Sequence, residues 1–297
     1  MVSRQCLQYV APSGNSYKDS GKWSFTKVLF RLRTVRITSN MVFERGASSG
    51  PGLSESRHMK RNAIIVGASS GIGLELAKLL AANGHSVGLV ARRLDLLAKL
   101  ACELPTRAFA KAIDVSKPIE AMPLLRELIV EMNDVELFVI GAGTGFINPE
   151  LDWEREQETI DLNVSGFTAI INVAVEHLQA RGSGHIVGIS SLAALRGSGA
   201  APAYNASKAF MSNYLQGLRQ RFRKLKLPVV VTDVQPGFVD TAMAKGEGLF
   251  WMASPEKAAH QIFDAIRKRR KHVYVTRRWR VIAWVLRVLP DSLYDKL

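Results

Sequence analysis

Tyr204 and Lys208 are the residues whose spacing most directly indicates chemistry. They lie four positions apart in the segment Tyr-Asn-Ala-Ser-Lys, so a helix would place both side chains on one face. A tyrosine hydroxyl has a pKa of about 10 and exchanges protons poorly at neutral pH, but a nearby ammonium group favours its ionised form. Ser191, thirteen residues upstream, adds a hydroxyl that can bind a carbonyl oxygen as negative charge develops on it. The combination suits general acid/base catalysis, whereas a Tyr-x-x-x-Lys pair alone is common on helix surfaces.

A glycine-rich segment near the start of the predicted fold can bind phosphate. It follows an apolar stretch that ends at Val66 and precedes a segment with helical spacing of apolar residues. Glycine permits a tight turn and lets the backbone approach a pyrophosphate at the N-terminus of the next helix. Any strand-to-helix turn favours glycine, so this context is what strengthens the motif. The predicted contacts with a dinucleotide are Gly67, Ser69, Ser70, Gly71, Ile72 and Gly73.

The end of the second predicted strand indicates which dinucleotide is bound. An acidic residue there would bind both ribose hydroxyls of NAD. The chain instead reads Ala91-Arg92-Arg93, which offers two guanidinium groups to a 2′-phosphate. We therefore predict NADP(H) as the cofactor and Arg92 as its main partner. The alternative is that both arginines are solvated residues at a helix start.

Apolar periodicity predicts alternating strands and helices between residues 62 and 276. The predicted strands span residues 62–66, 85–90, 108–113, 135–140, 185–190, 228–234 and 273–276. The predicted helices span residues 71–80, 94–104, 123–132, 152–179, 203–224 and 255–268. Such alternation requires right-handed crossovers and a mostly parallel sheet. The predicted fold class is therefore α/β, a doubly wound Rossmann-type sheet with helices on both faces, in a single domain over residues 59–297.

The chain from Met59 to about Thr241 resembles the classical short-chain dehydrogenase/reductase family. The resemblance rests on motifs in the family's order and approximate spacing: Gly67, Gly71 and Gly73, the pair Asp114-Val115, Asn163 in Leu-Asn-Val-Ser-Gly, Ser191, Tyr204, Lys208, and Pro236-Gly237 followed by Thr241. It implies an oxidoreductase that transfers a hydride between a nicotinamide and a carbonyl or alcohol. An NADP preference suggests that the reaction runs as a reduction.

The same resemblance implies a role for each motif. Tyr204 would be the general acid/base, Lys208 would lower its pKa and hold the nicotinamide ribose, and Ser191 would orient the substrate oxygen. Asn163 would support a proton relay through a water molecule, and Asp114 would bind the adenine amino group. The segment from residue 236 to residue 241 would close over the nicotinamide. The implied cofactor contacts also include Val115, Gly141, Pro236, Gly237 and Thr241.

Two positions depart from the family's pattern. Val66 stands where the family usually has threonine, and residues 140–143 read Ile-Gly-Ala-Gly where the family usually has Asn-Asn-Ala-Gly. In the family those asparagines mainly support the central sheet. The departures therefore bear on local rigidity more than on catalysis.

The net charge of +14 is concentrated at the two ends of the chain. Residues 1–58 carry +6 and residues 256–297 carry +7, which leaves +1 for residues 59–255. A fold that binds phosphate backbones should carry its basic excess within the fold, so we predict no nucleic-acid partner. Two cysteines are too few for a disulfide framework, which favours a reducing compartment and a cytoplasmic protein.

The basic, serine-rich residues 1–58 show little periodicity, and we predict no domain there. Three interpretations stay open: a targeting segment, a disordered tail, or sequence translated from a start codon upstream of the natural one. Met59, directly before the first predicted strand, favours the last of these.

Residues 277–289 have the pattern of an amphipathic helix. Arg277, Arg280, Trp284 and Arg287 fall on one stripe, while the other side is filled by Ile282, Val285, Leu286 and Leu289. Such a helix either packs on its own domain or on a partner subunit, or it lies on an anionic lipid surface as a peripheral membrane contact. No run of 18 apolar residues is present, so a membrane-spanning helix is not expected.

Residues 240–255 combine two glycines with four bulky apolar residues, as a substrate lid would. A lid of this kind indicates a hydrophobic carbonyl or alcohol substrate, although Phe250 and Trp251 can equally fill the core. The family commonly pairs its long helices, here about residues 153–180 and 203–224, so we expect a homo-oligomer, either a dimer or a tetramer.

Three other classes of function are less consistent with the sequence. The six histidines form no ligand spacing such as HExxH, so no metal is predicted. Ser190 and Ser191 do not lie in G-x-S-x-G, which argues against a serine hydrolase. A catalytically silent regulator or scaffold with the same fold is the main alternative, and the intact set of Asn163, Ser191, Tyr204 and Lys208 argues against it.

Overall fold

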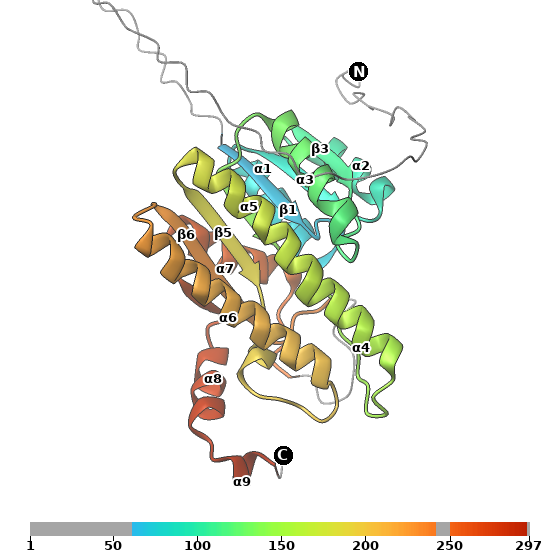
Figure 1. Cartoon of the computed structure of the whole chain (residues 1–297), viewed down its shortest axis with the longest axis vertical. Helices are drawn as coiled ribbons and strands as arrows, with labels where there is room; N and C mark the ends of the chain where they lie inside the picture. The colour runs from blue at the N-terminus through green and yellow to red at the C-terminus, as the bar shows by residue number, and fades with distance from the viewer. Residues whose placement is uncertain (1–60, 242–249, 296–297) are drawn as a thin grey trace, which may run out of the picture. The chain divides into compact units, whose positions relative to one another are not determined.

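The computed structural model of the chain describes residues 61–241 and 250–295. Within these ranges seven strands form one parallel sheet in the order β3-β2-β1-β4-β5-β6-β7 (Figure 1). The strands are β1 Arg61–Val66, β2 His85–Ala91, β3 Ala108–Ala112, β4 Leu137–Ile140, β5 Gly184–Ile189, β6 Val229–Pro236 and β7 His272–Val275. The predicted extension over residues 1–58, and residues 242–249 of the predicted lid, lie outside the described residues.

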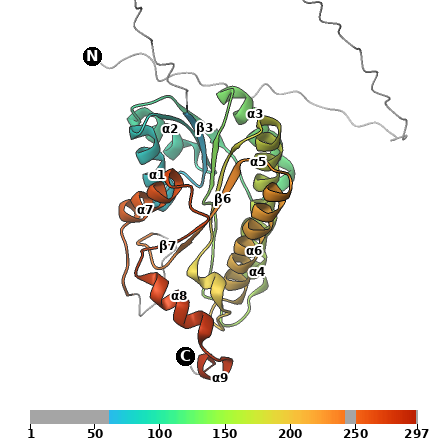
Figure 2. The ribbon, with the colours of Figure 1, turned by 90° about the vertical axis from the view of Figure 1, so that its left-hand side faces the viewer.

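Helices cover both faces of this sheet, as Figure 2 shows edge-on. One face carries α1 Gly71–Ala82, α2 Leu94–Glu103 and α7 Pro255–Arg267, whose apolar sides form a buried cluster with the strands. The other face carries α3 Pro118–Met132, α4 Trp153–Ile160, α5 Phe167–Arg181 and α6 Pro202–Lys224. A second buried cluster lies there and includes Phe138, Phe167 and Phe222. The predicted doubly wound Rossmann-type fold is confirmed.

The strand order reverses direction between β1 and β4, which are neighbours in the sheet. From β1 the chain winds outward to β3 and then returns to β4 and continues to the other edge. In open α/β sheets, ligands bind beyond the carboxyl ends of the strands at such a reversal. The loops after Val66 and Ile140 therefore border the expected binding crevice.

Within residues 62–276, two elements begin two or more residues away from their predicted start. Helix α3 starts at Pro118 rather than at residue 123, and Pro123 lies inside it. Proline suits the first helical position because its φ is already close to the helical value and the amide hydrogen that it lacks would have no partner there. Either Pro118 or Pro123 could therefore mark a helix start in the sequence. Strand β4 starts at Leu137, two residues later than predicted, and all four of its residues are buried.

The long helix predicted over residues 152–179 contains an irregular turn. Helices α4 and α5 are joined without a break by the π-helical turn Asp161–Gly166. A π-helical turn widens the helix and re-aims its side chains, and such turns are frequent at functional sites. Here it carries Asn163, which is fully buried.

Two short helices end the described chain, α8 Trp279–Val288 and α9 Asp291–Tyr294. Helix α8 lies within the predicted range of 277–289 and follows β7, an edge strand of the sheet (Figure 2). Arg196 holds the end of α8, because its Nε donates to the carbonyl of Leu286 at 2.9 Å. Among the described residues, none of the helices is long and apolar enough to cross a membrane.

Candidate active site

The loops after β1 and β4 are in close contact at the carboxyl edge of the sheet. The amide of Gly141 donates to the carbonyl of Val66 at 2.8 Å. A Cβ atom at Gly67, where φ is +95°, would lie 2.7 Å from the amide nitrogen of Ala142. Only glycine permits this approach at residue 67, and the predicted contact residues Gly67 and Gly141 are thereby brought together.

The glycine segment has the shape that a dinucleotide requires. A Cβ atom at Gly73 would collide with the carbonyl oxygen of Gly67, so the start of α1 packs directly on the turn before it. Ser70 is the N-cap residue, and within this described segment neither a side-chain cap nor an acidic residue is present in the first turn of α1. The amides at this N-terminus therefore remain able to bind an anion. Thr241 lies against Gly71, since its Cγ2 is 3.0 Å from where a Cβ would be.

Arg93 lies across the glycine segment. Its Nη2 donates to the Ser69 hydroxyl at 3.0 Å, and the Arg93 side chain is exposed while Ser69 is half-buried. Arg92 is exposed and lies near the Asp114 carboxylate, with which it interacts electrostatically. Two guanidinium groups thus border the end of β2, and the one in direct contact with the glycine segment is Arg93, where the sequence had singled out Arg92.

Asp114 follows β3 and is held by Ser116. Burial raises the pKa of the Asp114 carboxyl, but hydrogen bonds from the Ser116 hydroxyl and amide, with the charges of Arg92 and Lys117, outweigh it and leave the pKa below its usual value. The hydroxyl bond measures 2.7 Å. Asp114 is therefore an ionised hydrogen-bond acceptor. Val115, the next residue, is buried, and its carbonyl oxygen lies where a Cβ at Gly166 would be.

Tyr204 lies at the start of α6 with Ser191 beside it. Burial raises the pKa of the Tyr204 hydroxyl, and a hydrogen bond with the Ser191 side chain opposes part of that rise. The net direction is upward, so the chain by itself holds Tyr204 as a neutral phenol. The Lys208 Nζ lies 5.8 Å from the centroid of the Tyr204 ring, on the same helix face as predicted.

The structure separates the two adjacent serines after β5. Ser190 is buried, and its hydroxyl donates to the Asp233 carboxylate and to the carbonyl of Val234. Ser191 is the one that points to Tyr204, and its Oγ also accepts the amide of Ala193 at the start of the 3-10 turn Leu192–Leu195. Of these two serines, Ser191 is therefore the one whose hydroxyl faces Tyr204.

Lys208 is a buried cation. Its Nζ donates to the carbonyl of Ile189 at 3.2 Å and lies 3.6 Å from the sulfur of Met211. Burial lowers the pKa of Lys208 to about 8, although Asp233 acts in the opposite direction. The Nζ also lies 3.2 Å from where a Cβ at Gly143 would be, so this ammonium reaches the loop after β4.

Asn163 joins three elements of the site. Its Oδ1 accepts the Thr144 amide at 2.9 Å, and its Nδ2 donates to the Thr144 carbonyl at 2.7 Å and to the Ser207 hydroxyl at 3.0 Å. Ser207 in turn donates to the carbonyl of Tyr204 at 2.8 Å. The π-helical turn thus fixes the loop after β4 against the helix that carries Tyr204 and Lys208.

The predicted contacts Pro236 and Gly237 end β6 beside helix α8. The Gly237 amide donates to the carbonyl of Val275 at 2.6 Å. A Cβ at Gly237 would collide with the indole of Trp279, which is buried. Glycine at residue 237 therefore lets α8 pack directly on the segment expected to cover the nicotinamide.

Comparison with known proteins agrees with this geometry. The family model described as short chain dehydrogenase matches residues 61–249. An uncharacterised oxidoreductase of Myxococcus xanthus is 33% identical over 247 residues, which cover 79% of this chain and 95% of that protein. The chain belongs to the short-chain dehydrogenase family. An uncharacterised oxidoreductase of Mycobacterium tuberculosis is 30% identical over 246 residues, with 79% of this chain and 96% of that protein covered.

Solved structures share the fold of this short-chain dehydrogenase. A short-chain dehydrogenase/reductase from Burkholderia phymatum in complex with NAD gives a TM-score of 0.69 at 21% identity, over 76% of this chain and 92% of that one. A short-chain dehydrogenase from Sphingobium yanoikuyae in complex with NADPH gives 0.66 at 23% identity, over 80% and 96%. An alcohol dehydrogenase from Thermococcus sibiricus complexed with 5-hydroxy-NADP gives 0.66 at 24% identity, over 72% and 95%.

The dehydrogenase site is bordered by an aromatic cluster, which we define as Phe238, Phe250, Trp251 and Trp279. The Trp279 ring lies 5.4 Å from Phe238, 5.2 Å from Phe250 and 5.8 Å from Trp251. Phe250 is 49% exposed and Trp251 is 43% exposed, so the alternative that they fill the core is wrong. The cluster therefore presents apolar surface next to the Gly237 segment.

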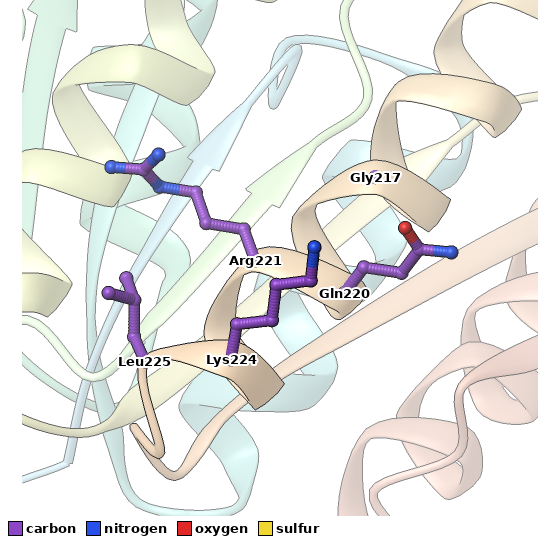
Figure 3. Close-up of a pocket in the computed structure, with 5 residues that line it drawn as sticks. All are labelled: Gly217, Gln220, Arg221, Lys224 and Leu225. Atoms are coloured by element: carbon purple, nitrogen blue, oxygen red, sulfur yellow. The ribbon is translucent and has the colours of Figure 1, made fainter.

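The dehydrogenase also has a surface hollow whose lining includes none of the candidate site residues and none of the aromatic cluster. It has a volume of about 360 Å³ and lies near the end of α6 opposite Tyr204 (Figure 3). In Figure 3 the side chains of Arg221 and Lys224 extend from that helix end. Its lining residues are Gly217, Gln220, Arg221, Lys224 and Leu225.

Sequence reasoning missed three residues of the dehydrogenase site. Thr144 and Ser207 hold Asn163, and Gly145 contacts the Tyr204 ring. Ser207 directly precedes Lys208, but nothing in the pattern indicates that its hydroxyl turns inward. Gly145 had a usable signal, because it is the third glycine in five residues after a buried strand.

Proposed function

We propose that this oxidoreductase is an NADP(H)-dependent carbonyl reductase that acts on hydrophobic ketones or aldehydes and can oxidise the matching alcohols. The observation that carries the proposal is the convergence of Tyr204, Ser191 and Lys208 at the carboxyl edge of the sheet. They lie beside a glycine segment whose tight packing leaves its helix amides available to a phosphate. The set also includes Asn163, which fixes the nearby loop.

Each catalytic side chain has a separate task in this proposal. A bound nicotinamide cofactor supplies or accepts the hydride. Tyr204, held neutral by its raised pKa, donates a proton to the carbonyl oxygen as negative charge develops there. The Ser191 hydroxyl orients that oxygen, and the Lys208 ammonium stabilises the phenolate that the proton leaves behind. Asn163 positions the surrounding backbone for a proton relay.

The cofactor contacts follow from the same edge of the sheet. The pyrophosphate would bind at the α1 N-terminus, the adenine at Asp114, and the nicotinamide beneath the segment from Pro236 to Thr241. Lys208 would hold the nicotinamide ribose. The residues proposed to line the rest of the cofactor site are Gly67, Ser69, Ser70, Gly71, Ile72, Gly73, Arg92, Val115, Gly141, Tyr204 and Gly237.

The preference for NADP rests on the charge at the end of β2. The structural neighbours are complexes with NAD in one case and with NADPH in another, so the fold accepts either. In this chain Arg92 and Arg93 border the place where the 2′-phosphate of NADP would lie, and Arg93 already binds Ser69. A guanidinium binds phosphate strongly and offers little to an unmodified ribose.

The hydrophobic substrate class rests on the aromatic cluster. Its exposed rings lie beside Gly237, where a substrate would enter above the nicotinamide. Apolar surface of this kind favours aliphatic or aromatic carbonyl compounds over sugars and hydroxy acids. Decanal and 2-decanone are suitable probes, with dihydroxyacetone as the polar comparison.

Turnover with these probes tests the function. NADPH should be oxidised with decanal or 2-decanone, and Tyr204→Phe should abolish this while leaving NADPH affinity nearly unchanged. Turnover retained by Tyr204→Phe would contradict the mechanism. A protein that binds NADPH but turns over no carbonyl compound would favour the silent-scaffold alternative. Reaction with dihydroxyacetone alone would contradict the hydrophobic substrate class.

We also propose that the protein is cytoplasmic and contacts anionic membranes through α8. Trp279 and Ala283 face inward, yet α8 exposes a second apolar stripe composed of Val281, Trp284, Val285 and Val288. Arg277, Arg280 and Arg287 are exposed on the same helix or directly before it. An apolar stripe flanked by arginines matches a lipid surface with acidic headgroups, which gives apolar area and charge together.

Vesicle binding tests this contact. The full chain should co-sediment with vesicles that contain phosphatidylglycerol and much less with pure phosphatidylcholine. Trp284→Ser together with Val288→Ser should abolish sedimentation, whereas the same change at the exposed Val130 of α3 should not. Equal sedimentation of the α8 variant and the wild type would exclude the contact. Dimerisation of the wild type that is lost in the α8 variant would assign the stripe to a second copy of the chain instead.

The expected homo-oligomer is proposed to form through the face of α4 and α6. Helix α4 lies beside α6, and large apolar side chains on this face are exposed, with Trp153 67% and Phe210 36% accessible. Phe210 stacks on Tyr214 at 5.6 Å between ring centroids. Sedimentation velocity should give a dimer or tetramer for the wild type and a smaller species for Phe210→Glu.

A further inference from the structure

Asp233 is a buried carboxylate that the sequence motifs do not explain. It lies in β6 and is 1% exposed. Three side chains donate hydrogen bonds to it: the Ser190 and Ser212 hydroxyls at 2.5 Å each and the Gln235 amide at 3.3 Å. Burying a carboxylate is unfavourable unless charge or hydrogen bonds compensate for the lost water. The three donors are uncharged, so a nearby cation would add to the stabilisation of the Asp233 carboxylate.

Lys208 is linked to Asp233 from two sides. On α6, Ser212 follows Lys208 by one helical turn and donates to Asp233 Oδ2. On β5, the Ile189 carbonyl accepts the Lys208 ammonium, and the next residue, Ser190, donates to Asp233 Oδ1. The effect of the Asp233 charge on the pKa of Lys208 agrees with this arrangement. Burial lowers the pKa of Lys208 to about 8, and Asp233 raises it against that trend.

Other charged or titratable groups also face Asp233, and they come from α6 and β7. Burial lowers the pKa of Arg219 on α6 and of His272 on β7, and Asp233 raises both. Tyr274 on β7 has a raised pKa, mainly through burial, and Asp233 contributes to the rise. Beyond them, two arginines of α8 act on this group of β7 residues, with Arg287 acting on His272 and both Arg280 and Arg287 on Tyr274. Two cations, the buried Lys208 and the half-buried Arg219, thus interact with Asp233, together with the titratable side chains of His272 and Tyr274.

We propose that Asp233 is the buried counter-charge that keeps the Lys208 ammonium protonated beneath the active site, and that it is thereby a positioning residue for the reaction. Lys208 is only 4% exposed, so bulk solvent stabilises its charge little, and a nearby carboxylate can compensate for that loss. The consequence for catalysis rests on the proposed function, since a neutral Lys208 neither stabilises the Tyr204 phenolate nor attracts the ribose. The charge relationship between the two residues does not depend on it.

A direct titration of Lys208 tests the proposal in the full chain without cofactor. Protein labelled with ¹³C-lysine is titrated by NMR, and the Lys208 resonance is the one that disappears in Lys208→Arg. The wild-type midpoint should lie at about 8. In Asp233→Asn, which keeps the shape but removes the charge, the midpoint should fall by at least about one pH unit. Ser212→Ala, which removes a hydrogen bond but keeps the carboxylate, should retain the wild-type midpoint.

An unchanged midpoint in Asp233→Asn would overturn the proposal. If this variant does not fold, Asp233→Glu replaces it, and the retained charge should hold the Lys208 midpoint near the wild-type value. If the Lys208 midpoint fell by a full pH unit in Asp233→Glu, the role assigned to the Asp233 charge would be refuted.

The pH profile of kcat for NADPH-dependent reduction of decanal adds a second measurement. The loss of activity at high pH should begin at lower pH in Asp233→Asn than in the wild type. If kcat of Asp233→Asn fell by the same factor at every pH, the role of Asp233 would be structural only. Failure of the wild type to reduce decanal would contradict the proposed function and leave the NMR result to decide the charge relationship.

Discussion

Gly145 lies with its backbone against the ring of Tyr204, at a separation that leaves no room for a Cβ atom. A Cβ built on Gly145 would collide with Cδ2 and also lie 2.9 Å from Cε2 and Cγ of that ring. The loop after β4 therefore forms one wall of the slot that holds the proposed proton donor. Because Asn163 fixes the adjacent Thr144 through both backbone groups, this wall is rigid.

Gly145→Ala should accordingly displace the Tyr204 ring while leaving the fold intact. The φ of Gly145 is outside the left-handed region, so alanine introduces no backbone strain of its own. A displacement of about 1 Å in a catalytic group can lower the rate by roughly 100-fold. We expect kcat with decanal to fall by about that factor. NADPH affinity, measured by fluorescence, should change little.

Gly199→Ala is the matched control, because a Cβ at Gly199 would meet nothing within 4 Å. It should keep wild-type kcat and thermal stability. Equal activity in the two alanine variants would show that the Gly145 contact does not position Tyr204.

Asn163→Ala should affect stability as well as turnover. It leaves the Thr144 amide and carbonyl without their side-chain partner, and each unsatisfied buried polar group costs about 1–3 kcal/mol. We expect the free energy of unfolding in urea to fall by about 2–4 kcal/mol. Ser207→Ala removes one of the three hydrogen bonds of Asn163, and the bond from Ser207 to the Tyr204 carbonyl, but it leaves Thr144 bonded and should lower this free energy by about 1 kcal/mol. Similar losses in the two variants would contradict the assigned role of Thr144.

The fold could be predicted from the sequence because each strand and helix carries its own apolar period. The seven strands were found, and the boundary errors occurred where two signals compete, as at Pro118 and Pro123. The site was less predictable, because motifs identify residue types but not side-chain directions. Ser190 and Ser191 are adjacent and chemically identical, and only the sheet register directs one into the core and the other to Tyr204. Asp233 has no clear local signal, since two of its three hydrogen-bond donors are distant in sequence: Ser190 directly follows β5 and Ser212 lies in α6.

The cofactor preference should depend on both arginines at the end of β2. A charge-assisted hydrogen bond to a phosphate is worth about 1.5–3 kcal/mol, so its loss should raise the KM for NADPH by about 10-fold to 100-fold. We expect this for Arg92→Asp and, because Arg93 contacts the glycine segment, for Arg93→Asp as well. The KM for NADH, which lacks the 2′-phosphate, should stay the same or fall.

Arg107→Asp makes the same change of charge at the opposite end of the sheet, directly before β3 begins. It should leave the ratio of the two KM values unchanged. An unaltered ratio in both the Arg92 and the Arg93 variants would exclude these residues as the phosphate site.

His185 should make the stability of the fold depend on pH. It is buried in β5, its Nε2 lies 2.8 Å from the Thr232 hydroxyl, and burial together with the charge of Arg269 lowers its pKa from 6.5 to about 4. The unfolded chain therefore binds a proton on this residue between pH 6.5 and pH 4 while the folded chain does not. The stabilising contribution is complete above pH 6.5 and is lost as the pH falls towards 4, by about 3 kcal/mol in total.

His185→Gln should remove this dependence, because glutamine can still bond Thr232 but does not titrate. In urea unfolding the difference in stability between the wild type and His185→Gln should shift by about 3 kcal/mol between pH 7 and pH 4, against the wild type at low pH. Comparing the two proteins at each pH cancels the titration of their shared carboxylates. His260→Gln, at an exposed position on α7, should show the same pH dependence as the wild type. A constant difference for His185→Gln across this range would mean that His185 is protonated in the folded protein, which its apolar surroundings and the nearby Arg269 disfavour.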